Sequence, residues 1–123
     1  MTRTHPPLDP ELAAALTVVH EHLSPTITPG DIDALRANPM FAIADEDLMR
    51  NGTIDLRNFS APGPSGAPEI SLLVLRPAGL AAGAPVFYHI HGDGMIIGDG
   101  RTGVGGVLDW AVDNGAVVVS VDG

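Results

Sequence analysis

Residues 85–99 combine an apolar run with histidines, glycines and carboxylates at spacings that suit two kinds of chemistry. Residues 86–90 predict a strand, and this strand leads directly into His91-Gly92-Asp93-Gly94, a sharp glycine-rich corner. Glycine lets the backbone turn tightly and present its N–H groups with no Cβ in the way. Backbone N–H groups held in this manner can stabilise an oxygen atom that gains negative charge, so the corner is the first candidate site.

A metal site is the second interpretation of the same residues. His89, His91 and Asp93 alternate along an extended segment, so their side chains are expected on one side. Two imidazoles and a carboxylate suit zinc, and the spacing resembles the beginning of the metallo-β-lactamase signature. That signature continues with a histidine, whereas Gly94 follows here and the sequence has no later histidine. We therefore predict no metal site and no cofactor, and we interpret His89 as a structural residue.

A dinucleotide-binding βαβ unit is an alternative for the segment that follows the corner. Gly98, Gly100 and Gly103 fit the pattern G-x-G-x-x-G, and Asp122 ends the next predicted strand at a suitable distance. In that class of site the first glycine follows the strand at once. Here the corner at His91 to Gly94 breaks the strand several residues earlier, which makes this the alternative and not the leading interpretation.

The elements that must position these residues follow from periodicity and from helix and turn signals. Asp9 and Pro10 predict a helix start, and Thr28 with Asp31 predicts a second start with a capping-box-like pattern. The last predicted unit is strand–helix–strand, which requires parallel strands and an α/β layer, whereas the first two strands are expected to pair antiparallel. The sequence predicts helices near 10–23, 28–35, 45–50 and 102–113, and strands near 53–59, 69–77, 86–90 and 116–121.

Composition narrows the classes of partner and compartment. The chain has 123 residues, no cysteine, and 6 Lys and Arg against 15 Asp and Glu, which gives a net charge of −9. Disulfides and thiolate metal sites are excluded, and nucleic acid and anionic membranes are disfavoured as partners. No apolar run approaches the roughly 20 residues of a membrane span, and the first residues show no apolar signal core. We expect a cytoplasmic protein that binds neither membrane nor nucleic acid.

These residues together resemble the hormone-sensitive-lipase-like branch of the α/β-hydrolase fold, whose members carry His-Gly-Gly-Gly after the third strand. The match extends to Leu75-Arg76-Pro77, to residues 95–99 and to residues 117–122, which look like the fourth strand. The resemblance implies the fold class α/β, with cap or lid helices in residues 1–50 and about four strands of a mixed, mostly parallel sheet in residues 51–123. It implies hydrolysis of a small-molecule carboxylic ester without a cofactor.

The resemblance also assigns roles at the corner. The N–H groups of Asp93 and Gly94 would donate to the oxyanion, and His91 and Gly92 would support the loop. Asp93 departs from the family's glycine and brings a carboxylate to a place where negative charge must develop, so we expect it to lower activity.

No residue of the chain qualifies as the catalytic serine, acid or histidine. Ser65 lies in a near miss to G-x-S-x-G within a Pro- and Gly-rich loop, and Ser120 lies inside a predicted strand. We therefore expect the amino-terminal fragment of an esterase, truncated before the nucleophile elbow, which is silent alone and self-associates through an exposed sheet edge. A non-enzymatic truncated product is the alternative.

Overall fold

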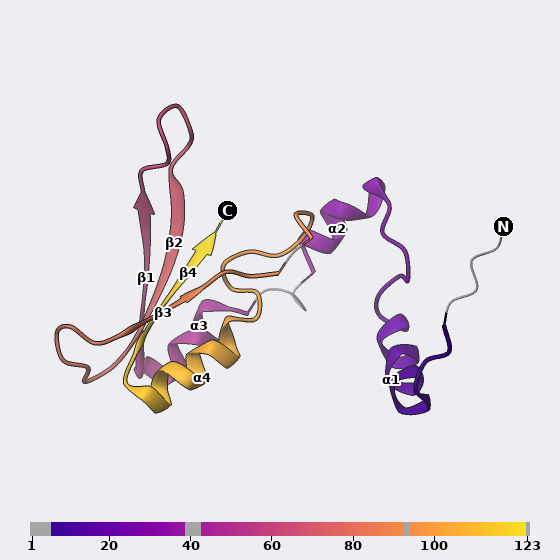
Figure 1. Cartoon of the computed structure of the whole chain (residues 1–123), viewed down its shortest axis with the longest axis horizontal. Coiled ribbons are helices and arrows are strands. Elements are labelled where there is room, and N and C mark those ends of the chain that lie inside the picture. Colours follow the sequence, from indigo (N-terminus) through magenta and orange to yellow (C-terminus); the bar gives the residue numbers. More distant parts are fainter. Residues whose placement is uncertain (1–5, 39–42, 93, 123) are drawn as a thin grey trace. The chain divides into compact units, whose positions relative to one another are not determined.

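The computed structural model describes residues 6–38, 43–92 and 94–122. These residues form a mixed four-stranded sheet with helices (Figure 1). The chain divides into two compact units, Met1–Asp31 and Ile32–Gly123. The elements are α1 (Pro10–His20), η1 (Pro29–Asp31), α2 (Ile32–Arg36), α3 (Asp45–Met49), η2 (Arg50–Gly52), β1 (Ile54–Ala61), β2 (Ile70–Pro77), β3 (Val86–His89), α4 (Val104–Asn114) and β4 (Val117–Asp122).

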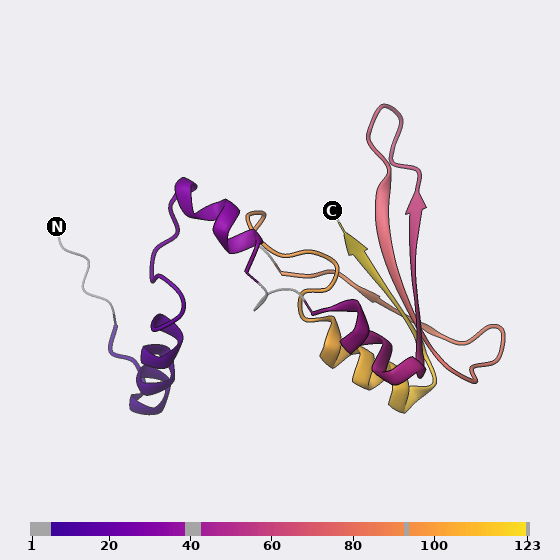
Figure 2. The ribbon, with the colours of Figure 1, turned by 180° about the vertical axis from the view of Figure 1, so that it is seen from behind.

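The strand order in the sheet is β1-β2-β4-β3. β1 and β4 both pair antiparallel with β2, and β3 pairs parallel with β4. Three of the four strands therefore run in one direction, and β2 runs against them, which confirms a mixed sheet; two of its strand pairings are antiparallel and one is parallel. The parallel pair is joined through α4, as the predicted strand–helix–strand unit requires (Figure 2).

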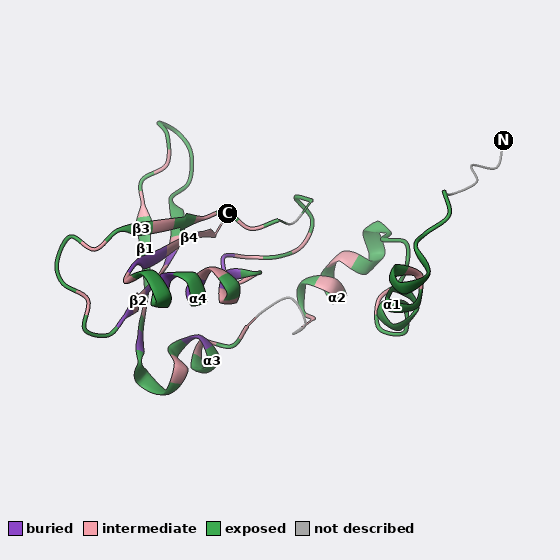
Figure 3. Cartoon of the chain, turned by 60° about the horizontal axis from the view of Figure 1, so that its bottom comes forward, coloured by how far each residue is buried: buried purple, intermediate pink, exposed green. Residues whose placement is uncertain are grey.

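One face of the sheet carries the hydrophobic core. Leu73 and Leu75 of β2 and Val118 of β4 pack with Leu48 of α3 and with residues of α4 (Figure 3). Successive residues of a strand point to opposite faces, so burial alternates along β2. The buried residues of α4 are Val104, Leu108 and Ala111, whereas Trp110, which the sequence also placed on this helix, is 63% exposed.

Local signals set the ends of several elements as expected. The side chain of Asp9 accepts the N–H of Glu11 at the start of α1, and the carboxylate of Asp31 accepts both the N–H and the hydroxyl of Thr28. These hydrogen bonds favour the ionised form and lower the pKa of Asp31. Gly115 ends α4 in the left-handed conformation, with φ of 62°.

The helix α1 contrasts with α4 because none of its residues is buried. The helix ends at His20, so the predicted end near residue 23 is wrong. Leu12, Leu16 and Val19 do share the helix, but all three are exposed. The expected role of residues 1–50 as a cap or lid stays a prediction.

Candidate functional site

The predicted corner follows β3 and has an unusual backbone. Gly94 and Met95 both adopt the left-handed conformation, with φ of 58° and 62°. Asp93, the other predicted donor to the oxyanion besides Gly94, lies outside the described residues. A Cβ added at Gly94 would have no other atom within 4 Å. Glycine is therefore favoured here by its φ angle and not by a lack of space.

Met95 is a feature that sequence reasoning missed. A non-glycine residue with positive φ is uncommon because this conformation is strained. Such a residue persists only where the surrounding structure holds it, and residues of this kind cluster at functional sites. The Met95 side chain is 92% exposed, so core packing does not explain its position in the turn. Its only signal in the sequence is the pair of glycines that precede it at positions 92 and 94.

The loop between β3 and α4 is attached to the end of β4. Gly100 is buried, and its N–H donates to the carboxylate of Asp122 at 3.0 Å. Its carbonyl accepts the hydroxyl of Ser120 at 2.6 Å. A Cβ on Gly100 would lie 3.3 Å from both Asp122 Cβ and Val121 O, so only glycine lets the loop approach β4 this closely.

Two histidines lie at the end of β3. The Nδ1 atom of His89 is 2.8 Å from the hydroxyl oxygen of Ser120, and burial of the ring lowers the pKa of His89, with a smaller contribution from the charge of His91. His91 is half-buried, and its ring lies against Gly98, where a Cβ would come within 3.4 Å of Nδ1. The ring of His89 is therefore in contact with β4, and the ring of His91 with the loop that follows the corner.

Two arginines connect the same loop to the segment that precedes the sheet. The Nε of Arg36 donates to the carbonyl of Ile96 at 2.8 Å, and the Nε of Arg101 donates to Asp45 at the same distance. The bond to Asp45 raises the pKa of Arg101. The loop is thus attached both to β4 and to residues some sixty positions earlier, since Arg36 and Ile96 are 60 residues apart.

The glycines of the dinucleotide alternative serve the internal packing of this loop. Gly98 has φ of 96°, and a Cβ there would lie 3.1 Å from Thr102 Oγ1. Gly103 is the N-cap of α4, with φ of 72°. The carboxylate of Asp122, which would bind a ribose in that interpretation, accepts the N–H of Gly100. Among the described residues, no group of three or more His, Asp or Glu could hold a metal ion.

The serines have the surroundings that the sequence predicts. Ser65 is exposed in the loop between β1 and β2, where the N–H of Ala67 donates to the carbonyl of Pro64 in a local turn. Ser120 is buried inside β4. Neither stands between a strand and a helix, which is the arrangement that a nucleophile elbow requires.

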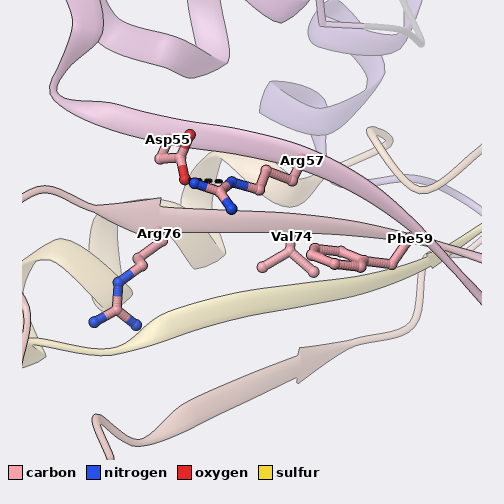
Figure 4. Close-up of a pocket in the computed structure, with 5 residues that line it drawn as sticks. All are labelled: Asp55, Arg57, Phe59, Val74 and Arg76. Carbon is pink, nitrogen blue, oxygen red and sulfur yellow. Dashed lines mark hydrogen bonds and ion pairs between the residues drawn. The ribbon is translucent and has the colours of Figure 1, made fainter. Parts of the chain in front are cut away.

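A separate hollow of about 310 Å³ lies on the β1–β2 pair (Figure 4). Its lining residues occupy alternate positions, which places them on the sheet face opposite the core: Asp55, Arg57, Phe59, Val74 and Arg76. The guanidinium of Arg57 is paired with Asp55 at 2.8 Å, and that of Arg76 donates to the carbonyls of Leu80 and Ala81. Its charged groups are thus occupied within the chain.

Solved structures of esterases share the fold of this chain. A bacterial heroin esterase is 31% identical and superimposes with a TM-score of 0.65, over 94% of this chain and 35% of that protein. A hyperthermophilic esterase from the archaeon Pyrobaculum calidifontis is 28% identical with a TM-score of 0.62, over 94% of this chain and 36% of that protein. A thermostable esterase from Pseudomonas putida, 24% identical with a TM-score of 0.60, shares the fold over 98% of this chain and 37% of that protein.

No family model and no curated protein sequence matches the chain. The structural matches define its class, which is the α/β-hydrolase fold, and the chain spans about 35–37% of the length of these solved structures. The chain corresponds to the amino-terminal portion of hormone-sensitive-lipase-like α/β-hydrolases, as the resemblance of its sequence implied. No helix in the described part of the chain is long and apolar enough to cross a membrane.

Proposed function

We propose that this chain supplies the oxyanion-binding corner and the first strands of a carboxylic-ester hydrolase that acts on small-molecule esters without a cofactor. One observation carries the proposal: the residues that follow β3 turn through consecutive left-handed positions, in a chain that is 31% identical to a solved esterase over 94% of its length. A turn of this kind frees backbone N–H groups from the strand ladder. Such groups can stabilise the oxyanion of ester hydrolysis.

The roles at the corner come from the sequence. The N–H groups of Asp93 and Gly94 donate to the oxyanion, while His91 and Gly92 support the turn. Each donor of this kind is worth about 3–4 kcal/mol of barrier. The carboxylate of Asp93 opposes the developing charge, so its replacement by glycine is expected to raise turnover. A cytoplasmic location likewise remains a prediction from the sequence.

A chimera tests this proposal. Residues 1–122 replace the matching segment of the bacterial heroin esterase, and hydrolysis of p-nitrophenyl butyrate is measured. The expected result is turnover above that of the same chimera whose nucleophilic serine is replaced by alanine, and higher turnover still after Asp93→Gly. A folded chimera that is no faster than its serine variant contradicts the proposal.

The chain alone is proposed to be catalytically silent. Ser65 is exposed in a hairpin loop and Ser120 is buried, so neither is presented as an activated nucleophile within the described residues. A burst of p-nitrophenol from the purified chain, lost in Ser65→Ala or Ser120→Ala, would contradict this part.

We also propose that the chain self-associates through β3. This strand and β1 are the two outermost of the four described strands, and β3 pairs only with β4. Val86 and Tyr88 of β3 are 58% and 60% exposed, so large hydrophobic side chains lie beside the outer backbone edge of this strand. Light scattering is expected to find oligomers that Tyr88→Lys dissociates. If the unmodified chain is a monomer at the concentration used for the Tyr88→Lys variant, the proposal is contradicted.

A further inference from the structure

We propose that Ser120 is a positioning residue that holds together His89 and Gly100, the residues on either side of the segment that carries the candidate corner. Its hydroxyl links His89, which ends β3, to Gly100, which lies further along the loop before α4. The benefit to catalysis rests on the proposed function, but the link itself is a property of this chain. We call this link the Ser120 bridge.

The Ser120 bridge lies inside the protein. Ser120 is 0% exposed and is the only buried polar side chain among the described residues. Its Oγ is 2.6 Å from the carbonyl oxygen of Gly100 and 2.8 Å from Nδ1 of His89. Both distances are typical of well-formed hydrogen bonds, so a single hydroxyl satisfies two groups from two different segments.

The direction of both bonds follows from the number of protons. A carbonyl oxygen only accepts, so the one hydroxyl proton of Ser120 is donated to Gly100. Oγ must then accept from His89, which assigns the Nδ1–H tautomer to the neutral ring and leaves Nε2 without a proton. The imidazolium form also carries a proton on Nδ1, so the bond persists on either side of the titration.

The bridge acts together with Asp122 and with the packing of Gly100. The N–H of Gly100 donates to Asp122, so both polar groups of this residue end on side chains of β4. The corner lies between His89 and Gly100 in the chain, so fixing these two positions closes the loop at its base. A loop with fixed ends loses fewer conformations when its turn becomes ordered. We infer that this closure helps to hold the left-handed turn at Gly94 and Met95.

The tautomer of His89 in the unmodified chain is the first test. Nitrogen chemical shifts of ¹⁵N-histidine-labelled protein, recorded above the pKa of the ring, distinguish the two tautomers. The proposal requires Nδ1 of His89 to be protonated and Nε2 to be unprotonated. The opposite tautomer, or rapid exchange between both, overturns it. This measurement needs no ester turnover, so it remains decisive if the proposed function fails.

Hydrogen exchange of Ser120 variants is the second test. Ser120→Ala removes both bonds, and we expect amides of residues 95–101 to exchange about tenfold faster, while those of β1 and β2 keep their protection. Ser120→Thr keeps a hydroxyl and should restore slow exchange in the loop. Ser71→Ala on the exposed part of β2 is the matched control and should change nothing.

Three outcomes of this series overturn the proposal: unchanged exchange in Ser120→Ala, equal acceleration throughout the sheet, and failure of threonine to restore protection in a folded variant. If Ser120→Ala does not fold, the tautomer of His89 in the unmodified chain decides.

Discussion

The chain has two glycine-rich loops whose sequences both approach motifs of ester hydrolysis, and the structure treats them differently. The loop between β1 and β2 carries Ser65 in its near miss to G-x-S-x-G, and its hydrogen bonds are local, such as Ser60 to Glu69 across the hairpin. The loop between β3 and α4 carries the corner and is bonded to α2, to Asp45 and to β4. Long-range attachment, more than glycine content, separates a candidate site from a plain turn.

The largest expected difference between these loops concerns their glycines. Gly100→Ala puts a Cβ 3.3 Å from Asp122 Cβ and Val121 O, and overpacking of this kind costs about 1–3 kcal/mol. Gly66→Ala meets no atom within 4 Å and pays only for its φ of 82°, about 1 kcal/mol. Urea unfolding of both variants measures the costs. A Gly100→Ala variant as stable as the unmodified chain would contradict the close packing of the β3–α4 loop against β4.

A smaller difference is expected for the two ion pairs. Arg101 bonds to Asp45 across 56 residues, and its side chain is 21% exposed, whereas Arg57 bonds to Asp55 on the same strand and is 67% exposed. We expect Arg101→Met to cost about 1 kcal/mol and Arg57→Met less than about 0.5 kcal/mol. The same unfolding experiments check this. Equal losses would show that long-range attachment of the loop adds nothing.

The smallest expected effect is a dependence of stability on pH through His89. Burial lowers the pKa of His89 below its ordinary value of 6.5, so the unfolded chain binds the proton more readily. The stabilising contribution of neutral His89 is complete above 6.5 and is lost as the pH falls through the lowered pKa of the folded state. Unfolding free energies on both sides of this range should therefore decline toward acid. His89→Asn should reduce that decline, and an identical slope in the variant would contradict the assignment.

The sequence predicted the fold well where local signals and burial agree. The helix start at Asp9 and the strand expected near 69–77 both correspond to observed elements, α1 and β2. The prediction was wrong for the end of α1, which was expected near residue 23 and lies at His20. The spacing of Leu12 and Leu16 describes a possible helix face, but it gives no information on whether another element covers that face. Periodicity reports amphipathic character, and burial needs a partner.

The site could be predicted only in part. Glycines at 92 and 94 marked the corner, but the left-handed turn at Met95 depends on how the whole loop is held. The bonds of Arg36 to Ile96 and of Ser120 to Gly100 join residues far apart in the chain, so no motif reports them. Ser120 was correctly placed inside a strand, yet its role as a bridge follows only from the distances to His89 and Gly100.

Transfer of the corner into an active enzyme tests whether this loop binds the oxyanion. Residues 90–103 are grafted in place of the matching loop of the bacterial heroin esterase, and kcat and KM for p-nitrophenyl butyrate are measured with Asp93 and with Asp93→Asn. We expect an active graft with reduced kcat and unchanged KM, and a rise in kcat of about tenfold after Asp93→Asn, because the loop acts on the charge of the transition state. A folded graft without turnover in either form, or one whose substitution changes only KM, would contradict the claim that this loop binds the oxyanion.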